Sequence, residues 1–174
     1  MQIYHKWTGL RLEVAEYITK NNISEEDFRF LGIYEWQDIY DKVLEHFVDE
    51  QYARKCGLYW SNIENGFRKD IDKIYGFAYK KQDSYKWMER LSEIVKCEKV
   101  YLLLEEDSSK YWIAECNPAI IDFIVNDTYS VEDYYITDKK FNWLITENHS
   151  EVIQFIGKGL DLETIKGVCE DYME

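Results

Sequence analysis

Proline and glycine are scarce in this chain, which has 1 proline and 8 glycines among its 174 residues. Flexible linkers and low-complexity tracts are built largely from such residues, so we expect neither. The chain also lacks an uninterrupted apolar stretch near the roughly 20 residues that cross a bilayer. Its first residues lack the apolar run and cleavage site of a signal peptide. These absences predict a cytoplasmic protein without a membrane partner.

Cysteine is too scattered for a metal site or a disulfide framework. The 4 cysteines form no Cys-x-x-Cys pair, and together with the 3 histidines they match no zinc-binding spacing. Free cysteine behaves as a small core residue, so we expect buried, reduced thiols and no metal or cofactor. The cysteines are Cys56, Cys97, Cys116 and Cys169.

Basic residues are also few, and their shortage is concentrated in the last third of the chain. The formal net charge is −13, and residues 101–174 contain 16 Asp and Glu against 5 Lys. Nucleic acids and anionic membranes are bound mainly through Lys and Arg, so neither is an expected partner. Two interpretations stay open: the acidity keeps an aromatic-rich protein soluble, or it forms a surface that binds a basic partner.

Apolar residues, by contrast, are plentiful. They make up 46% of the chain, and 17% of all residues are aromatic, which is ample for a core and excludes a disordered chain. The length suits one domain of ordinary size. We therefore expect a single domain over residues 1–174, with a helical part at about 1–97 and a sheet part at about 98–174.

The first half has the periodicity of helices, because its apolar residues recur at helical spacing. Ser24 precedes three acids in a pattern typical of a helix start, and residues 61–64 match a capping box. The strongest pattern predicts a helix over residues 35–48, with an apolar stripe opposite a face of acids. The predicted helical segments are residues 10–18, 35–48, 63–76 and 83–95.

The second half has the pattern of a sheet. Residues 99–105 form an apolar run that returns through a polar turn as residues 111–116, which predicts a hairpin. Asn117 and Pro118 then begin a short helix. A three-strand meander and a last helix follow, at residues 134–137, 141–146, 152–156 and 161–173.

The order of these elements predicts an α+β fold. We expect the helical N-terminal half to pack on a mainly antiparallel sheet of about five strands, made of a hairpin, a short helix and a three-strand meander, with a C-terminal helix.

Acidic and aromatic residues gather at the ends of the predicted strands. Tyr and Trp are favoured at binding hot spots, particularly inside a polar rim. Because Tyr134 and Tyr135 follow Glu132 and Asp133, we expect them to be exposed anchors framed by acids. The predicted partner-binding residues are Glu105, Glu106, Asp107, Glu132, Asp133, Tyr134, Tyr135 and His149.

His149 suggests a different possibility, because it lies in a turn beside strand ends, where catalytic groups often sit. A general base needs an orienting partner and a substrate within reach, which adjacency to Ser150 and Glu151 does not supply. We therefore predict no catalytic residue. Two alternatives stay open: a small enzyme with a cleft at His149, and an inhibitor whose carboxylates mimic nucleic-acid phosphates.

One segment resembles known proteins. In residues 134–149, followed by residues 152–157, an aromatic strand, the turn Asp138-Lys139-Lys140 and a second aromatic strand succeed one another. The pattern is similar to that of a group of small bacterial proteins of unknown function. It also looks like the acidic α+β immunity proteins, the SUKH type among them, that protect bacteria from polymorphic toxins. The resemblance covers about residues 99–160.

The resemblance implies a cytoplasmic bacterial protein that neutralises a toxin by direct stoichiometric binding. It transfers no catalytic residue, so we expect a binding protein and not an enzyme. The partner would be a basic protein, the cognate toxin. Opposite charge would speed the association, and aromatic side chains buried at the interface would hold the complex.

Overall fold

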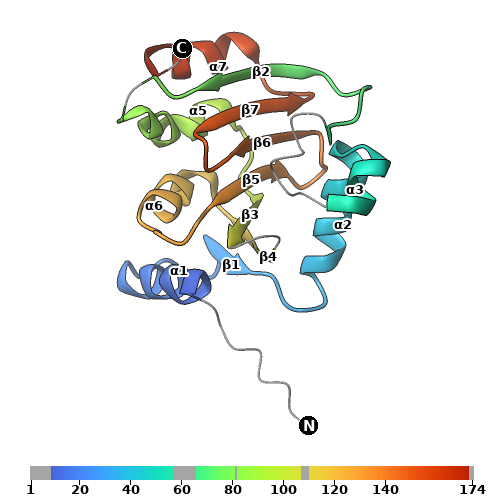
Figure 1. The fold of residues 1–174 in the computed structure, drawn as a ribbon. Helices are drawn as coiled ribbons and strands as arrows, with labels where there is room; N and C mark the ends of the chain where they lie inside the picture. The colour runs from blue at the N-terminus through green and yellow to red at the C-terminus, as the bar shows by residue number, and fades with distance from the viewer. Residues whose placement is uncertain (1–8, 57–65, 81, 107–109, 173–174) are drawn as a thin grey trace.

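A single antiparallel sheet organises the molecule (Figure 1). The structure is a computed structural model that describes residues 9–56, 66–80, 82–106 and 110–172. Within these ranges seven strands lie in the order β1-β4-β3-β5-β6-β7-β2. They are β1 (Phe28–Phe30), β2 (Lys73–Ala78), β3 (Val100–Glu106), β4 (Lys110–Cys116), β5 (Asp133–Asp138), β6 (Trp143–Glu147) and β7 (Val152–Gly157).

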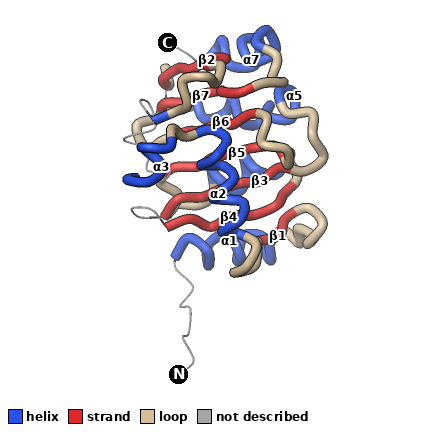
Figure 2. The backbone as a smooth tube through the Cα atoms, turned by 90° about the vertical axis from the view of Figure 1, so that its right-hand side faces the viewer, coloured by secondary structure: helices blue, strands red, loops and turns tan. Residues whose placement is uncertain are grey.

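Helices cover both faces of this sheet, and the mixture confirms the predicted α+β class (Figures 1 and 2). Helices α2 and α3 lie on one face, called the α2 face below, and α1, α5, α6 and α7 lie on the other, called the α6 face. The helices are α1 (Gly9–Lys20), α2 (Trp36–Phe47), α3 (Glu50–Cys56), α5 (Leu91–Ile94), α6 (Ile121–Asn126) and α7 (Leu162–Cys169), with the 3-10 turns η1 (Ser84–Arg90), η2 (Pro118–Ile120) and η3 (Glu170–Tyr172).

Two hydrophobic cores follow from this layering, one on each face of the sheet. Successive residues of a strand point to opposite faces, so Leu102 and Leu104 of β3 pack into the core of the α6 face, whereas Leu103 packs against Val43 and Phe47 of α2. All three leucines are fully buried. The continuous apolar run in β3 is therefore explained by a strand that is covered on both sides.

Helix α2 forms where the sequence predicts it. Ile39, Val43 and Phe47 are buried against the sheet, and on the outer face Lys42 Nζ lies 2.7 Å from Asp38 Oδ2, one turn away. The predicted hairpin, the meander and the helices near residues 10–18 and 83–95 are likewise present. The last helix begins at Leu162, where the Asp161 carboxylate accepts a hydrogen bond from the Thr164 amide.

The helix predicted over residues 63–76 is wrong in its described part. Strand β2 forms there instead and pairs with β7, with Tyr75 opposite Phe155. Tyr75, Phe77 and Tyr79 alternate along the chain toward the core of the α6 face, so pairing with a distant strand outweighs the helical spacing of the isoleucines. The capping box at residues 61–64 lies outside the described residues.

The helix start predicted at Ser24 is also wrong. The Ser24 hydroxyl donates to the Asp27 carboxylate at 2.8 Å and closes a turn that leads into β1, where Phe28 pairs with Cys116 of β4. The first half therefore supplies both edge strands, β1 and β2. This is why the sheet has seven strands instead of about five.

The turn between β5 and β6 is fixed by side chains and by one glycine. Asp138 accepts hydrogen bonds from the Asn142 amide and side chain, each at 2.6 Å. Across the turn, Gly157 has φ +98°, and a Cβ there would lie 2.3 Å from the Asn142 carbonyl oxygen. Such an approach is open only to glycine, so the register of β6 against β7 is firmly set.

Two thiols are buried as predicted. Cys116 and Cys169 are free and buried, and Cys97 is free and half-buried. None of the helices in the described ranges has the length and apolarity to cross a membrane.

Candidate functional site

The predicted partner-binding residues do not form one surface. Glu105, Asp133 and Tyr135 lie on the α2 face, since they alternate with residues of the other core. Glu106 and Tyr134 belong to the α6 face. His149 and Glu132 are exposed in loops, and Asp107 lies outside the described residues.

Tyr134 and Tyr135 are not exposed anchors, contrary to the prediction. Their exposed fractions are 3% and 0%, because β5 lies between β3 and β6 and has helices over both faces. Glu132 is exposed, but its amide is fixed by a 3.0 Å hydrogen bond to the Glu105 carbonyl. A partner that docks on β5 would meet no aromatic side chain there.

Two of the predicted acids are brought together and buried. Glu105 and Asp133 are paired across β3 and β5 and are 2% and 3% exposed. The Tyr111 hydroxyl donates to Glu105 Oε2 at 3.0 Å. His149 donates its amide to Asp133 Oδ1 at 2.8 Å and places its Nδ1 2.9 Å from the same oxygen. This pair links the sheet to its loops and presents no acidic surface.

A third acid, the half-buried Glu147, carries a network that the sequence did not reveal. Its Oε2 accepts hydrogen bonds from the hydroxyls of Tyr134 and Tyr79, and Tyr79 in turn accepts one from Trp87 Nε1 at 3.1 Å. Burial raises the pKa of Glu147 to about 7, and the two hydroxyls oppose this rise only in part. The Tyr134 hydroxyl therefore points into the protein, where it is bonded to Glu147.

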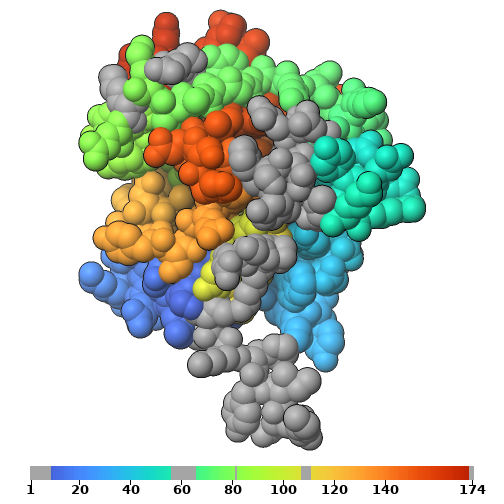
Figure 3. All heavy atoms as spheres, in the orientation of Figure 1, coloured from blue at the N-terminus to red at the C-terminus, as the bar shows by residue number. Residues whose placement is uncertain are grey.

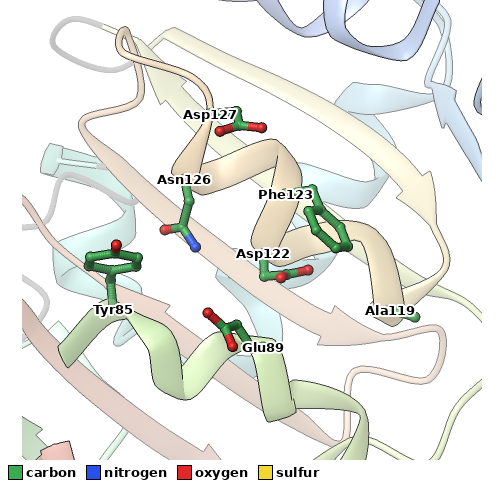
Figure 4. Close-up of a pocket in the computed structure, with 7 residues that line it drawn as sticks. All are labelled: Tyr85, Glu89, Ala119, Asp122, Phe123, Asn126 and Asp127. Carbon is green, nitrogen blue, oxygen red and sulfur yellow. The ribbon is translucent and has the colours of Figure 1, made fainter. Parts of the chain in front are cut away.

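An acidic pocket opens on the α6 face, between η1 and α6 (Figure 4). Its volume is about 520 Å³. Figure 4 shows the carboxyl groups of Glu89 on η1 and Asp122 on α6 at opposite sides of the same gap. Among the described residues that line it there is no Lys or Arg. The lining residues are Tyr85, Glu89, Ala119, Asp122, Phe123, Asn126 and Asp127.

Aromatic side chains stand exposed in and beside this pocket. The exposed fractions of Tyr85 and Phe123 are 41% and 52%, and Tyr129, two residues beyond Asp127, reaches 97%. Figure 3 shows α6 and the following loop between the segments of η1 and α1. We call the pocket residues together with Tyr129 the acidic aromatic surface.

Local sequence features hold this surface in place. The Asn117 side chain accepts a hydrogen bond from the Ala119 amide, and Pro118 fills the next position, which starts the helical turn. On the far side, the Glu13 carboxylate of α1 accepts hydrogen bonds from the amides of Tyr129 and Ser130 at 3.1 and 3.2 Å. The exposed rings are thus attached to a fixed backbone.

The carboxylates of the pocket are stabilised by hydrogen bonds and not by basic side chains, since no Lys or Arg is among the described residues that line it. Asp122 is only 8% exposed; burial raises its pKa, the charge of Glu89 raises it further, and the amides of Phe123 and Asp122 oppose the rise. Burial also raises the pKa of Tyr17, as do the charges of Asp127 and Asp122. The pocket is therefore suited to a cationic group.

Sequence reasoning missed these residues. Residues 119–125 read as an almost wholly apolar helix, and the signal within them was the single acid, Asp122, set between Ile121 and Ile124. Its partner across the pocket, Glu89, lies 33 positions earlier in the chain. The periodicity of either helix gives no sign that the two face each other.

Comparison with known protein families gives a match. Neither the curated proteins nor the solved structures yield a similar protein. The model of a family of unknown function, DUF6756, matches residues 6–166, which is most of the chain. This chain, with its helix-covered antiparallel sheet and its acidic pocket, therefore belongs to that family of unknown function, DUF6756.

Proposed function

We propose that the protein is an acidic binding protein that neutralises a basic partner by direct stoichiometric binding, as a cytoplasmic immunity protein neutralises a bacterial toxin. The observation that carries this proposal is the acidic aromatic surface. Three exposed rings lie there among carboxylates, and the described residues that line the pocket include no Lys or Arg. The partner is a protein with a basic patch.

Aromatic and charged groups have separate roles in such a complex. Tyr and other aromatic side chains dominate the energy of interfaces when they become buried, whereas charges around them steer the encounter. Phe123 and Tyr129 have apolar area to lose, since they are 52% and 97% exposed. The net charge of −13 favours fast association with a basic protein.

The proposal places the interface on α6 and η1 instead of on β5. Tyr134 and Tyr135 are buried, so the acids beside them do not frame an aromatic anchor. The acidic and aromatic character expected at Asp133 and Tyr134 is found 11 residues earlier in the chain, at Asp122 and Phe123.

The experiment compares exposed aromatic residues at two separate places on the surface. In one variant Phe123→Ala and Tyr129→Ala remove the rings of the acidic aromatic surface; in the control, Tyr34→Ala removes a ring that is 94% exposed elsewhere. Binding to the purified toxin encoded beside the gene is measured by calorimetry. We expect at least tenfold weaker binding for the double variant, equal to about 1.4 kcal/mol, and little change for the control.

The salt dependence of the association rate is an independent test of the same interface. The association rate of the wild-type chain is expected to fall as the salt concentration rises, because surface charges are screened. A rate that does not depend on salt, or equal losses in the double variant and the Tyr34→Ala control, would contradict the proposal.

A second candidate function is catalysis at His149, which the contact with Asp133 favours. A buried carboxylate on one imidazole nitrogen fixes the tautomer, so the other nitrogen can act as a general base. The distance of 2.9 Å and the 54% exposure of the His149 side chain fit that role. Turnover of an ester or phosphoester substrate that is lost in His149→Gln would support this function over binding.

A further inference from the structure

The segment η1 is an uncommonly long 3-10 helix. It runs over 7 residues, Ser84–Arg90, and leads directly into α5. Runs of more than three or four residues are rare in 3-10 helices, because their hydrogen bonds are poorly aligned, and a 3-10 stretch within a helical segment often marks a hinge or strain. The position of η1 therefore depends on its contacts with the rest of the chain.

Trp87 anchors η1 in the core of the α6 face. Its side chain is fully buried, and its ring lies edge-on against Phe155, with 5.6 Å between the ring centroids. The Trp87 indole Nε1 donates to the Tyr79 hydroxyl at 3.1 Å, and Tyr79 donates in turn to Glu147 Oε2 at 2.8 Å. A chain of two hydrogen bonds therefore joins η1 to the Glu147 carboxylate.

Glu147 has no positive partner within the described ranges. Its Oε2 accepts hydrogen bonds from the Tyr134 and Tyr79 hydroxyls, and the charges that act on it, those of Glu151 and Asp133, are negative. The ionised carboxylate is thus stabilised by hydrogen bonds alone while it is partly shielded from water. Contact with water would stabilise the ionised form further.

The bases on the elements around Glu147 are engaged elsewhere or exposed. Lys86 and Arg90 of η1 are paired with neighbouring acids at the surface, and His149 lies against Asp133. The titratable and charged groups on these elements are Tyr134 and Asp133 on β5, His149 and Glu151 in the turn between β6 and β7, Tyr79 and Lys80 after β2, Lys86, Glu89 and Arg90 on η1, and Cys169 and Lys166 on α7.

We propose that η1 and Tyr79 form a pH-sensitive cover over Glu147, which opens more readily as the pH rises through neutrality. Opening breaks the bond between Trp87 and Tyr79 and lets water reach the carboxylate. Closing is favoured while the carboxyl group is protonated, because a neutral group is kept from water at little cost. Since η1 carries Tyr85 and Glu89, the acidic aromatic surface is complete only in the closed state. The cover is a property of the free chain and is independent of the proposed function.

The size of the effect follows from the ionisation of Glu147 in the two states. Burial raises its pKa from 4.5 to about 7 in the closed chain, and full hydration on opening returns the pKa to its ordinary value. Below pH 4.5 the group is protonated in both states, whereas between pH 4.5 and 7 the open state ionises first. By linkage, the population of the open state should rise roughly tenfold from pH 6 to pH 8.

Hydrogen exchange on the full-length chain tests the cover. Protection factors of the η1 amides and of the Trp87 indole, corrected for intrinsic exchange, are measured by NMR at pH 6 and pH 8. We expect both to fall roughly tenfold in the wild-type chain and to stay constant in Glu147→Gln. The η1 amides should also be less protected at pH 8 than those of β3, a central strand covered on both faces. Equal protection of η1 and β3, or the same fall in Glu147→Gln, would overturn the proposal.

His149→Gln is the matched control, because His149 is a second titrating group two residues from Glu147. The fall in η1 protection should persist in this variant, and its disappearance would assign the pH dependence to the imidazole and overturn the proposal. A second measurement requires no variant and stands even if Glu147→Gln fails to fold. The ¹³Cδ shift of Glu147 in the wild-type chain should titrate with a midpoint at about pH 7, and a midpoint below pH 4.5 would overturn the cover.

Discussion

Replacing Glu147 with glutamine measures the free-energy cost of ionising a half-buried carboxylate. In the wild-type chain Glu147 Oε2 accepts hydrogen bonds from Tyr134 and Tyr79. Glutamine retains an oxygen that accepts both hydroxyl protons and has the same shape, but it cannot ionise. The substitution therefore removes the charge and keeps the packing.

The magnitude follows from the pKa of Glu147, which burial raises from 4.5 to about 7. Below pH 4.5 the group is protonated in both the folded and the unfolded chain, and it contributes nothing to the pH dependence. Between pH 4.5 and 7 the unfolded chain ionises first, so the free energy of unfolding falls as pH rises. At 1.36 kcal/mol for each pH unit, the loss amounts to roughly 3 kcal/mol above pH 7.

The assay is urea denaturation of both chains at pH 5 and pH 8. Because the glutamine variant lacks this ionisation, we expect it to exceed the wild-type chain in stability at pH 8 and to approach it at pH 5. For a slope of about 2 kcal/mol per molar urea, the midpoint gap should be on the order of 1 M wider at pH 8. Glu163→Gln is the control, because its side chain is 80% exposed on α7.

The decisive quantity is the difference in stability between Glu147→Gln and the wild-type chain, because all other titrating groups are present in both. If Glu147→Gln and wild type lose the same stability between pH 5 and pH 8, Glu147 is ionised in the folded chain at no cost and the reasoning is refuted. A pH-dependent gain of similar size in Glu163→Gln would refute it as well.

Three further substitutions test the structure that supports the surface. Asn117→Ala removes the side-chain acceptor for the Ala119 amide, and a thermal melt should show a loss of about 1 kcal/mol. Gly157→Ala forces a Cβ to within 2.3 Å of the Asn142 carbonyl oxygen at φ +98°; we expect a loss of at least ~2 kcal/mol in urea denaturation, and an unchanged midpoint would contradict the turn geometry. Leu102→Ala leaves a cavity in a fully buried site, with an expected loss of roughly 3 kcal/mol and faster amide exchange in β3.

The parts of the fold that the sequence predicts are those determined by neighbouring residues. Helix α2 has a complete apolar stripe, and the β3–β4 hairpin and the β5–β6–β7 meander are joined by short polar turns. Strand β2 was missed, because its partner β7 lies about 80 residues away. The alternation of Tyr75, Phe77 and Tyr79 was present in the sequence, but the spacing of Ile71 and Ile74 suggested a helix.

The candidate site was predicted in character but not in place. An excess of acids beside aromatic residues does mark the surface, yet it is formed by Tyr85, Glu89 and Phe123 with their neighbours. Whether Tyr134 is exposed depends on what packs over β5, which the local sequence does not state. The meeting of η1 with α6 depends in turn on how both pack on the sheet.

The strand order has a consequence for synthesis on the ribosome. The five central strands come from residues 100–157, whereas both edges, β1 and β2, are made earlier in the chain. β1 pairs with β4 and β2 pairs with β7, so each emerges before its partner exists. Strand β1 must wait for β4 and strand β2 must wait for β7, and until its partner emerges each is an unpaired, aromatic edge segment of the nascent chain. The sheet is therefore completed at both edges only after β7 has emerged, and a chaperone that shields unpaired strands would act before that point.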